Sequence, residues 1–252
     1  MTKKKYFSKL DKDKGYFIIK LKQNELKKIQ KIVEDHLIKR IKTIYPNLEK
    51  DFKKNRIYNY HKLSNKINHK LLWNYMARCL TKSKVNSIKK LSFFNNIKKI
   101  FGSFKILDDQ DIGYGVMNCR IVRPYEKNDI TPLHADKWFW WDSKRKKFQK
   151  NSIMKNKRRI RCWISLWAHK SFGLKGVPFS QKNSYEYKTK FKNGEEKPIF
   201  NYSKYTVKPV SFDSTPGNAI IFHEGLLHTG TLNKFNKTRI SLEFSMFVNN
   251  LS

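Results

Sequence analysis

The sequence predicts one α+β domain that is mainly β, with a helical segment over residues 1–105 and a core of β-strands over residues 106–252. Two patterns predict this division. Apolar residues recur at helical spacing in the first part of the chain, and short apolar or alternating runs divided by Gly, Pro, Asn and Asp follow Ile106. A chain of 252 residues is long enough for one sizeable core and short for two, so we expect a single domain.

The clearest helix is expected over residues 24–45, where Pro46 closes a pattern with apolar residues every three or four positions. These apolar positions are Leu26, Ile29, Val33, Leu37, Ile41 and Ile44. Shorter helices are expected over residues 71–79 and 87–100, and the second of them ends near Gly102. The helical half should therefore pack one face and expose a charged one.

Short strands are expected in the second half, in the pattern of a β-sandwich or barrel. The expected strands are residues 115–123, a segment around His134, and residues 159–169, 205–212, 218–223 and 239–247. Residues 179–204 are rich in Lys, Asn and Tyr and are expected to form a long connection. With Tyr185 and Tyr187, this connection is our candidate for a lid over a substrate.

Several residues that could hold a metal lack the spacing for it. No second ligand type lies at useful spacing from the first three histidines, so surface or capping roles are expected for His36, His61 and His69. The three cysteines form no C-x-x-C pair and leave an odd count; they are Cys79, Cys119 and Cys162. A disulfide framework and a thiolate zinc site are therefore not expected, and a reducing, cytoplasmic setting is.

The chain is strongly basic, with a formal net charge of +35. Such a charge raises the question of a nucleic-acid partner, because Lys and Arg gain affinity for phosphate by releasing counterions. Most of the basic residues are Lys, accompanied by many Asn and Ile, and a solvated coat of Lys accounts for that pattern equally. No binding motif is visible, so no specific nucleic acid is expected. The basic N-terminus lacks the apolar stretch of a signal peptide, and no membrane insertion is expected.

The segment TPLHADKWFWWD contains a histidine and an aspartate two residues apart, His134 and Asp136. On an extended segment, both side chains project from the same face. A second imidazole would complete the 2-His-1-carboxylate triad, which leaves three coordination positions open and suits non-haem Fe(II). The later segment NAIIFHEGLLHTG offers two candidates for that imidazole, His223 and His228.

The last expected strand carries a basic residue on a face that otherwise looks buried. A period of two places Arg239, Ser241 and Glu243 on one side and Ile240, Leu242, Phe244 and Met246 on the other. A buried guanidinium needs an anionic partner, and a dicarboxylate ligand would supply one through two parallel hydrogen bonds. The structural alternative is an ion pair of Arg239 with Glu243 or Asp213.

The order of these residues resembles that of the Fe(II)- and 2-oxoglutarate-dependent dioxygenases, and specifically the phytanoyl-CoA dioxygenase-like family. The resemblance covers about the last 140 residues, and its most specific segments are PLHAD, PGNAIIFHEGLLHTG and TRISLEF. The resemblance implies a double-stranded β-helix (jelly-roll) core in which His134, Asp136 and His228 bind iron. His228 is preferred to His223 because only His228 precedes Arg239 by the family's spacing.

The resemblance also implies how the co-substrate is held. Arg239 and Ser241 would bind the distal carboxylate of 2-oxoglutarate, and Asn118 and Arg120 fall where the family places a polar residue and an Arg facing the active site. Arg123 could be chosen instead of Arg120 on similar grounds.

Aromatic residues near the metal pair have two interpretations. Trp138, Phe139, Trp140 and Trp141 directly follow that pair. They either seal the mouth of the barrel or offer flat faces to a substrate, and the substrate-binding candidates are Trp138 and Trp140. Trp163 and Ser165 could likewise line the pocket or pack between sheets.

The resemblance implies an enzyme that hydroxylates an unactivated C–H bond of a small anionic or polar metabolite, using O2 and converting 2-oxoglutarate to succinate and CO2. Asp136 favours hydroxylation over halogenation, which in related enzymes goes with a small residue at that position; desaturation and ring closure stay open. The alternatives are a basic nucleic-acid-binding protein and an inactive jelly-roll binding module whose three ligands do not converge.

Overall fold

The computed structural model describes residues 3–74, 76–140, 157–192 and 195–249. Its largest sheet is antiparallel and has the strand order β1-β9-β4-β11-β2, with β3 also paired to β11. The strands are β1 (Tyr16–Lys20), β2 (Phe104–Ile106), β3 (Asn118–Val122), β4 (Lys157–Trp167), β9 (Asn218–His223) and β11 (Arg239–Asn249). The long strands β4 and β11 lie at its centre, and they supply most of the residues discussed below.

Helices cover one face of this sheet. They are α1 (Lys3–Asp11), α2 (Gln23–Ile44), α3 (Glu49–Asn55), α4 (His69–Leu72), α5 (Lys82–Lys89) and α6 (Ser92–Phe101). The main hydrophobic core joins buried residues of α2 and α6 to the apolar faces of the central strands: Ile160, Cys162, Ile164 and Leu166 of β4, and Ile240, Leu242, Phe244 and Met246 of β11. The predicted alternation of β11 is confirmed, and the other face of the sheet is left for polar side chains.

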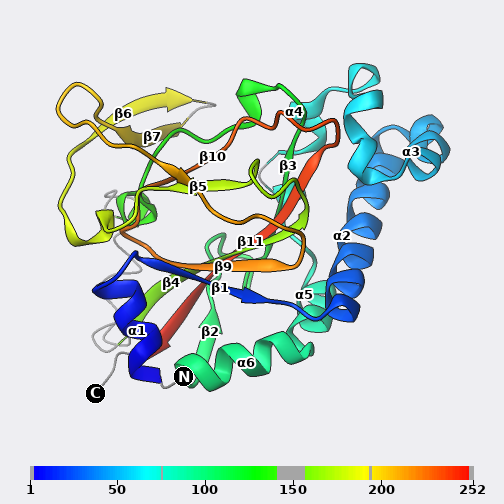
Figure 1. Cartoon of the computed structure of the whole chain (residues 1–252). Coiled ribbons are helices and arrows are strands. Elements are labelled where there is room, and N and C mark those ends of the chain that lie inside the picture. Colours follow the sequence, from blue (N-terminus) through cyan, green and yellow to red (C-terminus); the bar gives the residue numbers. More distant parts are fainter. Residues whose placement is uncertain (1–2, 75, 141–156, 193–194, 250–252) are drawn as a thin grey trace.

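A smaller sheet lies over that other face. It consists of β5 (Leu174–Gly176), β8 (Val210–Ser211) and β10 (His228–Gly230), in the order β10-β5-β8. In Figure 1, strands β1 and β9 lie between α6 below and β5 and β10 above. A second apolar cluster joins the two sheets, with Trp163, Ile220 and Phe222 from the large sheet and Leu174 and Phe212 from the segments around the small one. Trp163 is therefore a packing residue between sheets.

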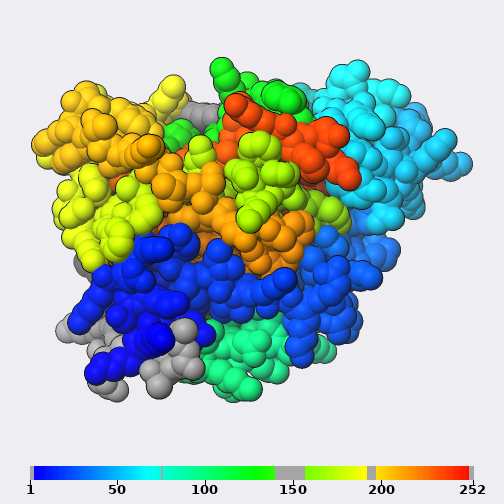
Figure 2. Space-filling model, viewed as in Figure 1, coloured from blue at the N-terminus to red at the C-terminus, as the bar shows by residue number. Residues whose placement is uncertain are grey.

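The first twenty residues add a strand that the sequence did not predict. β1 pairs antiparallel with β9, Ile18 opposite Ile220, and so extends the large sheet at its edge. Figure 2 shows these N-terminal residues, in blue, packed directly against the orange segment that contains β9. A five-residue strand without a clear alternation carries too little pattern to be recognised alone, and its edge pairing depends on β9 being present.

The predicted helix over residues 87–100 is wrong at its start, because the structure has two helices, α5 and α6, with a break between them. The carboxylate of Glu25 in α2 explains the break. Its Oε1 accepts hydrogen bonds from the Ser92 hydroxyl at 2.9 Å and from the Phe93 N–H at 2.8 Å, at the first turn of α6. A buried carboxylate from another helix thus caps α6, which a local pattern cannot reveal. The helix predicted over 71–79 is limited to α4 and a 3-10 turn at Met76–Arg78.

Two connections also differ from expectation. Residues 179–204, predicted to be a long connection, contain a hairpin of β6 (Tyr187–Lys192) and β7 (Glu195–Phe200). The strand predicted over 205–212 is reduced to the two residues of β8. Further 3-10 turns are Pro46–Leu48, Ile57–Lys66, Lys127–Asp129, Asp136–Trp140 and Ser180–Lys182.

The first three histidines are half-buried and hydrogen-bonded, and among the described residues none of them belongs to a group that could hold a metal. His36 donates to the Ala77 carbonyl over 2.9 Å, and the rings of His61 and His69 lie 3.0 Å and 2.8 Å from the hydroxyls of Thr238 and Tyr60.

Cys79, Cys119 and Cys162 are buried free thiols. Within the described ranges, no helix combines the length and the apolar character needed to cross a bilayer.

The two faces of the β1–β9 edge predict a contrast in stability. Ile221 is fully buried in the main core, whereas Ile18 is 38% exposed. We expect Ile221→Ala to lower the free energy of unfolding by about 2 to 5 kcal/mol and Ile18→Ala to lower it by less than about 1 kcal/mol, because only the first leaves a cavity. Urea unfolding of the two variants measures the difference, and equal losses would contradict this assignment of the core.

Candidate metal centre

A single backbone contact brings the two predicted histidine ligands together. His134 and His228 form an isolated antiparallel bridge, in which the N–H of each donates to the carbonyl of the other over 3.1 and 2.8 Å. The segment around His134 is thus not the regular strand that was predicted. Asp136 begins the 3-10 turn Asp136–Trp140 two residues later. Residues almost a hundred positions apart therefore share one site, with their ring centroids 4.4 Å apart.

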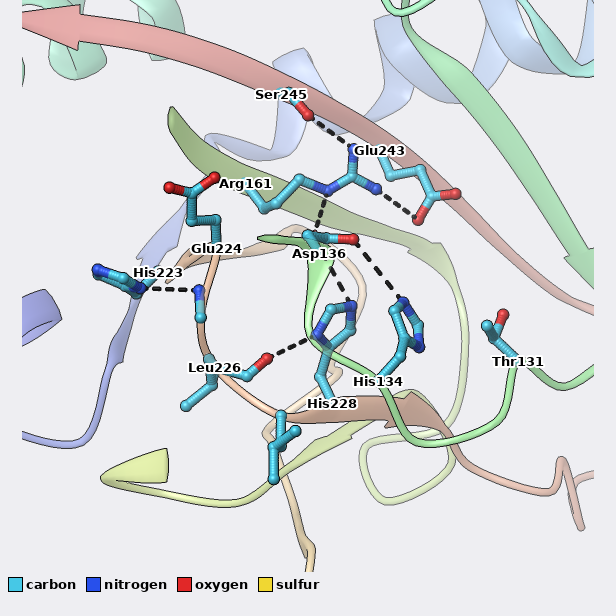
Figure 3. Close-up of polar contacts among 12 residues, drawn as sticks. Thr131, His134, Asp136, Arg161, His223, Glu224, Leu226, His228, Glu243 and Ser245 are labelled. Atoms are coloured by element: carbon cyan, nitrogen blue, oxygen red, sulfur yellow. Dashed lines mark hydrogen bonds and ion pairs between the residues drawn. The ribbon is translucent and has the colours of Figure 1, made fainter. Parts of the chain in front are cut away.

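The side chains of His134, Asp136 and His228 converge (Figure 3). One ligand atom from each lies within 4.8 Å of the others, and in the described part of the chain no other such group of His, Cys, Asp or Glu is found. All three side chains are buried, with 6 to 7% of each residue exposed. The Asp136 oxygens lie 3.7 Å from Nε2 of His134 and 3.9 Å from Nε2 of His228. These separations are too long for hydrogen bonds and suit atoms arranged around a shared cation.

Backbone carbonyls orient both imidazoles. Nδ1 of His134 lies 2.7 Å from the Pro132 carbonyl, and Nδ1 of His228 lies 2.9 Å from the Leu226 carbonyl. A carbonyl only accepts, so each Nδ1 carries a proton and each Nε2 is the nitrogen that faces the other site residues. Such outer hydrogen bonds are how proteins orient histidine ligands of metals. The donor set of two imidazoles and one carboxylate fits a divalent transition metal such as Fe(II).

The charges around the site favour these protonation states. Burial, helped by the nearby His134, lowers the pKa of His228 to about 4, so the ring is neutral at neutral pH. Burial alone would raise the pKa of Asp136. The positive charges around it, Arg161 foremost, instead hold the pKa of that carboxyl well below its usual range. Asp136 is therefore an anion with both imidazoles beside it.

Arg161 is the residue of the site that sequence reasoning missed. It lies on β4 and its Nε is 2.9 Å from Oδ2 of Asp136 (Figure 3). One pattern in the sequence could have found it: an Arg in the middle of the otherwise apolar run IRCWISL, on the strand face opposite the core. The period of two in β4 places Arg161 on the same face as Trp163, which confirms that this face looks away from the helices.

Arg239 is buried, with 3% of the residue exposed, and does not form the ion pair with Glu243 or Asp213 that was the structural alternative. Its Nη1 donates to three backbone carbonyls, those of Phe172, Gly173 and Thr231, over 2.7 to 2.8 Å. No carboxylate of the described residues lies within ion-pair distance of this guanidinium. Burial and the nearby Arg120 lower the pKa of Arg239 to about 9, so it is still a cation at neutral pH.

The other co-substrate candidates lie on the same face of the sheet. Register places Ser241 of β11 opposite Arg120 of β3, and Glu243 opposite Asn118. Nη2 of Arg120 donates to the Thr131 hydroxyl, and its Nη1 is 3.5 Å from Glu243. The amide oxygen of Asn118 accepts from the Cys79 thiol.

Three other candidates lie away from the metal residues. Arg123 pairs with Asp129 through two hydrogen bonds of 2.9 Å, so it is committed to a structural ion pair. Ser165 is fully buried and donates to the Ser214 carbonyl. His223 is turned away from the triad: its Nδ1 accepts from the Gly225 N–H, and its Nε2 is 3.9 Å from Asp11.

Aromatic rings line one side of the metal residues. Phe139, one of the four aromatic residues that follow the metal pair, places its ring 5.3 Å from that of His134 at nearly a right angle. Trp138 is buried and its ring lies 5.2 Å from that of Tyr187 in β6. The side chain of Trp140 and the whole of Trp141 lie outside the described residues.

Comparisons with known proteins show what this fold resembles. No family model matches the sequence, and no curated protein does. Solved structures do match. EctD from S. alaskensis, in a structure with 2-oxoglutarate and 5-hydroxyectoine, has a TM-score of 0.59 and 13% identity over 99% of this chain and 76% of its own. ThoJ, a non-heme monooxygenase in its apo form, has a TM-score of 0.53 and 11% identity over 96% of this chain and 76% of its own.

A third match is SnoK, a non-heme alpha-ketoglutarate dependent carbocyclase from nogalamycin biosynthesis, with a TM-score of 0.53 and 10% identity over 98% of this chain and 84% of its own. At these identities the matches show a shared fold. The chain therefore has the fold of non-haem oxygenases, and the argument for its chemistry must come from its own residues.

The placement of the two late histidines predicts a difference in metal binding. His228→Ala removes an imidazole from the triad and should weaken Co(II) binding by more than about 100-fold. His223→Ala is the matched control, since His223 is five residues away and contacts Gly225 and Asp11 instead. Isothermal titration of the metal-free proteins with Co(II) measures both. A loss in His223→Ala equal to that in His228→Ala would contradict the assigned triad.

Proposed function

We propose that this chain is an Fe(II)- and 2-oxoglutarate-dependent oxygenase, of the phytanoyl-CoA dioxygenase-like family and with a double-stranded β-helix core, that hydroxylates a small molecule. The observation that carries the proposal is the convergence of two imidazoles and one ionised carboxylate at a buried point. Supporting it, ThoJ has been solved as a complex with Ni, and the EctD structure contains 2-oxoglutarate. Binding of a metal and of 2-oxoglutarate is a property of those proteins. For this chain, the proposal depends on its own residues His134, Asp136 and His228.

The position of Arg239 supports 2-oxoglutarate as the co-substrate. A Cβ at Gly230 would lie 3.0 Å from Nη2 of Arg239, so the guanidinium lies directly beside β10. His228 begins the same strand, two residues before Gly230, and side chains two apart share a strand face. The guanidinium and the metal-binding imidazole are thus separated by about 7 Å along the strand. A five-carbon dicarboxylate can span that distance, with one end at the metal and its far carboxylate at Arg239.

The electrostatics of Arg239 support the same assignment. Carbonyl dipoles solvate one nitrogen of a buried cation but do not neutralise its charge. Among the described residues, hydrogen bonds are found only at Nη1, which leaves the rest of the guanidinium fork for a ligand. An incoming carboxylate would supply the missing anion, and Ser241, two residues along the same face, could donate a further hydrogen bond.

The chain's own residues then have distinct tasks. His134, Asp136 and His228 would hold Fe(II), which together with 2-oxoglutarate and O2 supplies the oxidising power for a C–H bond. Arg239 and Ser241 would fix the co-substrate, with Arg120 and Asn118 on the neighbouring strand. We propose hydroxylation as the outcome because Asp136 is retained as a ligand. SnoK, named a carbocyclase, shares the fold, so the fold alone does not determine the outcome.

The hairpin β6–β7 supports a small-molecule substrate enclosed above the metal. The N–H of Phe200, the last residue of β7, donates to the carbonyl of Leu133 over 2.8 Å, one residue before His134. Tyr187 of β6 packs its ring against Trp138, two residues after Asp136. We propose this hairpin as the lid and Trp138 and Trp140 as the substrate-binding residues, with the basic surface attracting a polar or anionic metabolite. The three buried free thiols support a reducing, cytoplasmic setting.

The proposed reaction predicts succinate formation that depends on the triad. Purified protein supplied with Fe(II), ascorbate and 2-oxoglutarate is screened against small polar metabolites for substrate-stimulated succinate release. His134→Ala should fall to background, whereas His223→Ala should retain turnover because His223 lies outside the triad. Equal succinate release by the parent and His134→Ala would remove the enzyme hypothesis.

The proposed co-substrate clamp predicts a specific kinetic change. Arg239→Lys keeps the charge but loses the fork, and should raise the KM for 2-oxoglutarate by about 10- to 100-fold with a smaller effect on kcat. Arg158→Lys is the control, because Arg158 lies on the neighbouring strand β4 and its guanidinium pairs with Asp11, away from Arg239. A KM for 2-oxoglutarate in Arg239→Lys within twofold of the parent would refute the clamp.

A further inference from the structure

The guanidinium of Arg161 contacts the carboxylate of Asp136, which is one of the three candidate metal ligands. Its Nε lies 2.9 Å from Oδ2 of Asp136 (Figure 3). The other oxygen of that carboxylate, Oδ1, is the one closer to His134, at 3.7 Å. Oδ2 also lies 3.9 Å from Nε2 of His228, so each oxygen faces one of the two imidazoles and Oδ2 is the one that contacts Arg161.

The position of Arg161 is set independently of Asp136. Its Nη1 donates to the Ser245 hydroxyl over 2.9 Å, and its Nη2 lies 3.7 Å from Oε2 of Glu243. Both partners belong to β11, which pairs with β4 along its whole length, with Ser245 opposite Arg161 in register. Contacts with β11 thus hold the two terminal nitrogens of the guanidinium, and Nε faces Asp136. A planar fork with three separate partners cannot rotate without breaking at least one contact.

We propose that Arg161 is a positioning residue that keeps Asp136 a one-oxygen ligand and so keeps a coordination position open for O2. The inference rests on the proposed function. A triad of three single-atom ligands leaves three positions, and 2-oxoglutarate would take two of them through its keto oxygen and one carboxylate. If Asp136 bound through both oxygens, the third position would be lost. Arg161 prevents this by engaging Oδ2, which leaves Oδ1 for the metal.

Removal of Arg161 would have two opposing effects on the affinity of the site for its metal. A cation close to a metal site repels the metal, so removing Arg161 on electrostatic grounds alone would strengthen metal binding. Removing it also takes the nearest cation from the buried carboxylate of Asp136 and frees that carboxylate to turn, whereas Glu243 keeps Arg120 at 3.5 Å. Metal affinity by itself therefore cannot decide the role, whereas access of a third ligand to the loaded site can.

The test uses nitric oxide as a stand-in for O2 under anaerobic conditions. The parent protein is loaded with Fe(II) and saturating 2-oxoglutarate, and nitric oxide binding is followed by electron paramagnetic resonance. We expect Arg161→Gln to bind 2-oxoglutarate but to bind nitric oxide at least about 10-fold more weakly than the parent. Arg158→Gln is the control: Arg158 is an Arg of the same strand, and its guanidinium pairs with Asp11 instead of Asp136. Nitric oxide binding by Arg161→Gln equal to that of Arg158→Gln would overturn the proposal.

Two further variants keep the proposal testable if Arg161→Gln does not fold. Ser245→Ala removes one support of the guanidinium without touching Asp136, and Arg161→Lys keeps the charge but cannot contact all three partners. Both should show a smaller loss of nitric oxide binding in the same direction, and parent-like binding in both would refute the role. If the parent itself does not bind Fe(II) and 2-oxoglutarate, the proposed function fails instead, so the two failures are distinguishable.

Discussion

The site depends on one short antiparallel contact, the pair of backbone hydrogen bonds between His134 and His228. These two bonds set the separation and the mutual orientation of the imidazoles, because opposite residues in an antiparallel pair have side chains on the same face. Everything else in the candidate centre is placed relative to that bridge. Asp136 follows His134 by two residues, the β6–β7 hairpin is hydrogen-bonded to the residue before His134, and β10 continues from His228 to the glycine beside Arg239.

The large sheet makes this contact possible by separating two environments. On one face, the apolar side chains of β4 and β11 join the helices in the main core. On the other, the same strands present Arg161, Arg239 and Glu243 to the site. Buried charges are tolerated there because each has a polar partner: Arg161 contacts Asp136 and Glu243, and Arg239 donates to backbone carbonyls. The helical half of the chain thus supports the large sheet on the face opposite the site, and none of its described residues belongs to the candidate metal ligands.

Pairing within the site also explains why its chemistry can be specific on a widely shared fold. The carbonyls of Pro132 and Leu226 fix which nitrogen of each imidazole is free, and these carbonyls belong to the turns that lead into the bridge. The ring of Phe139 lies against His134, and Tyr187 reaches the same region from the hairpin. The orientation of the two imidazoles is therefore a property of the bridge and its turns.

Local sequence was enough for the features that depend on periodicity and on chemical type. The 3.6-residue pattern of α2, the alternation of β11 and the chelating pair of His134 and Asp136 could be predicted from spacing along one segment. Spacing left His223 and His228 both open, and the preference for His228 followed from the resemblance to a known family. Only the tertiary structure decided the rest. The edge strand β1 exists through its pairing with β9, the break before α6 is made by the carboxylate of Glu25, and Arg161 reaches Asp136 only because β4 passes under the bridge. Each of these contacts joins segments that are far apart in the chain. Patterns among neighbouring residues therefore cannot predict them.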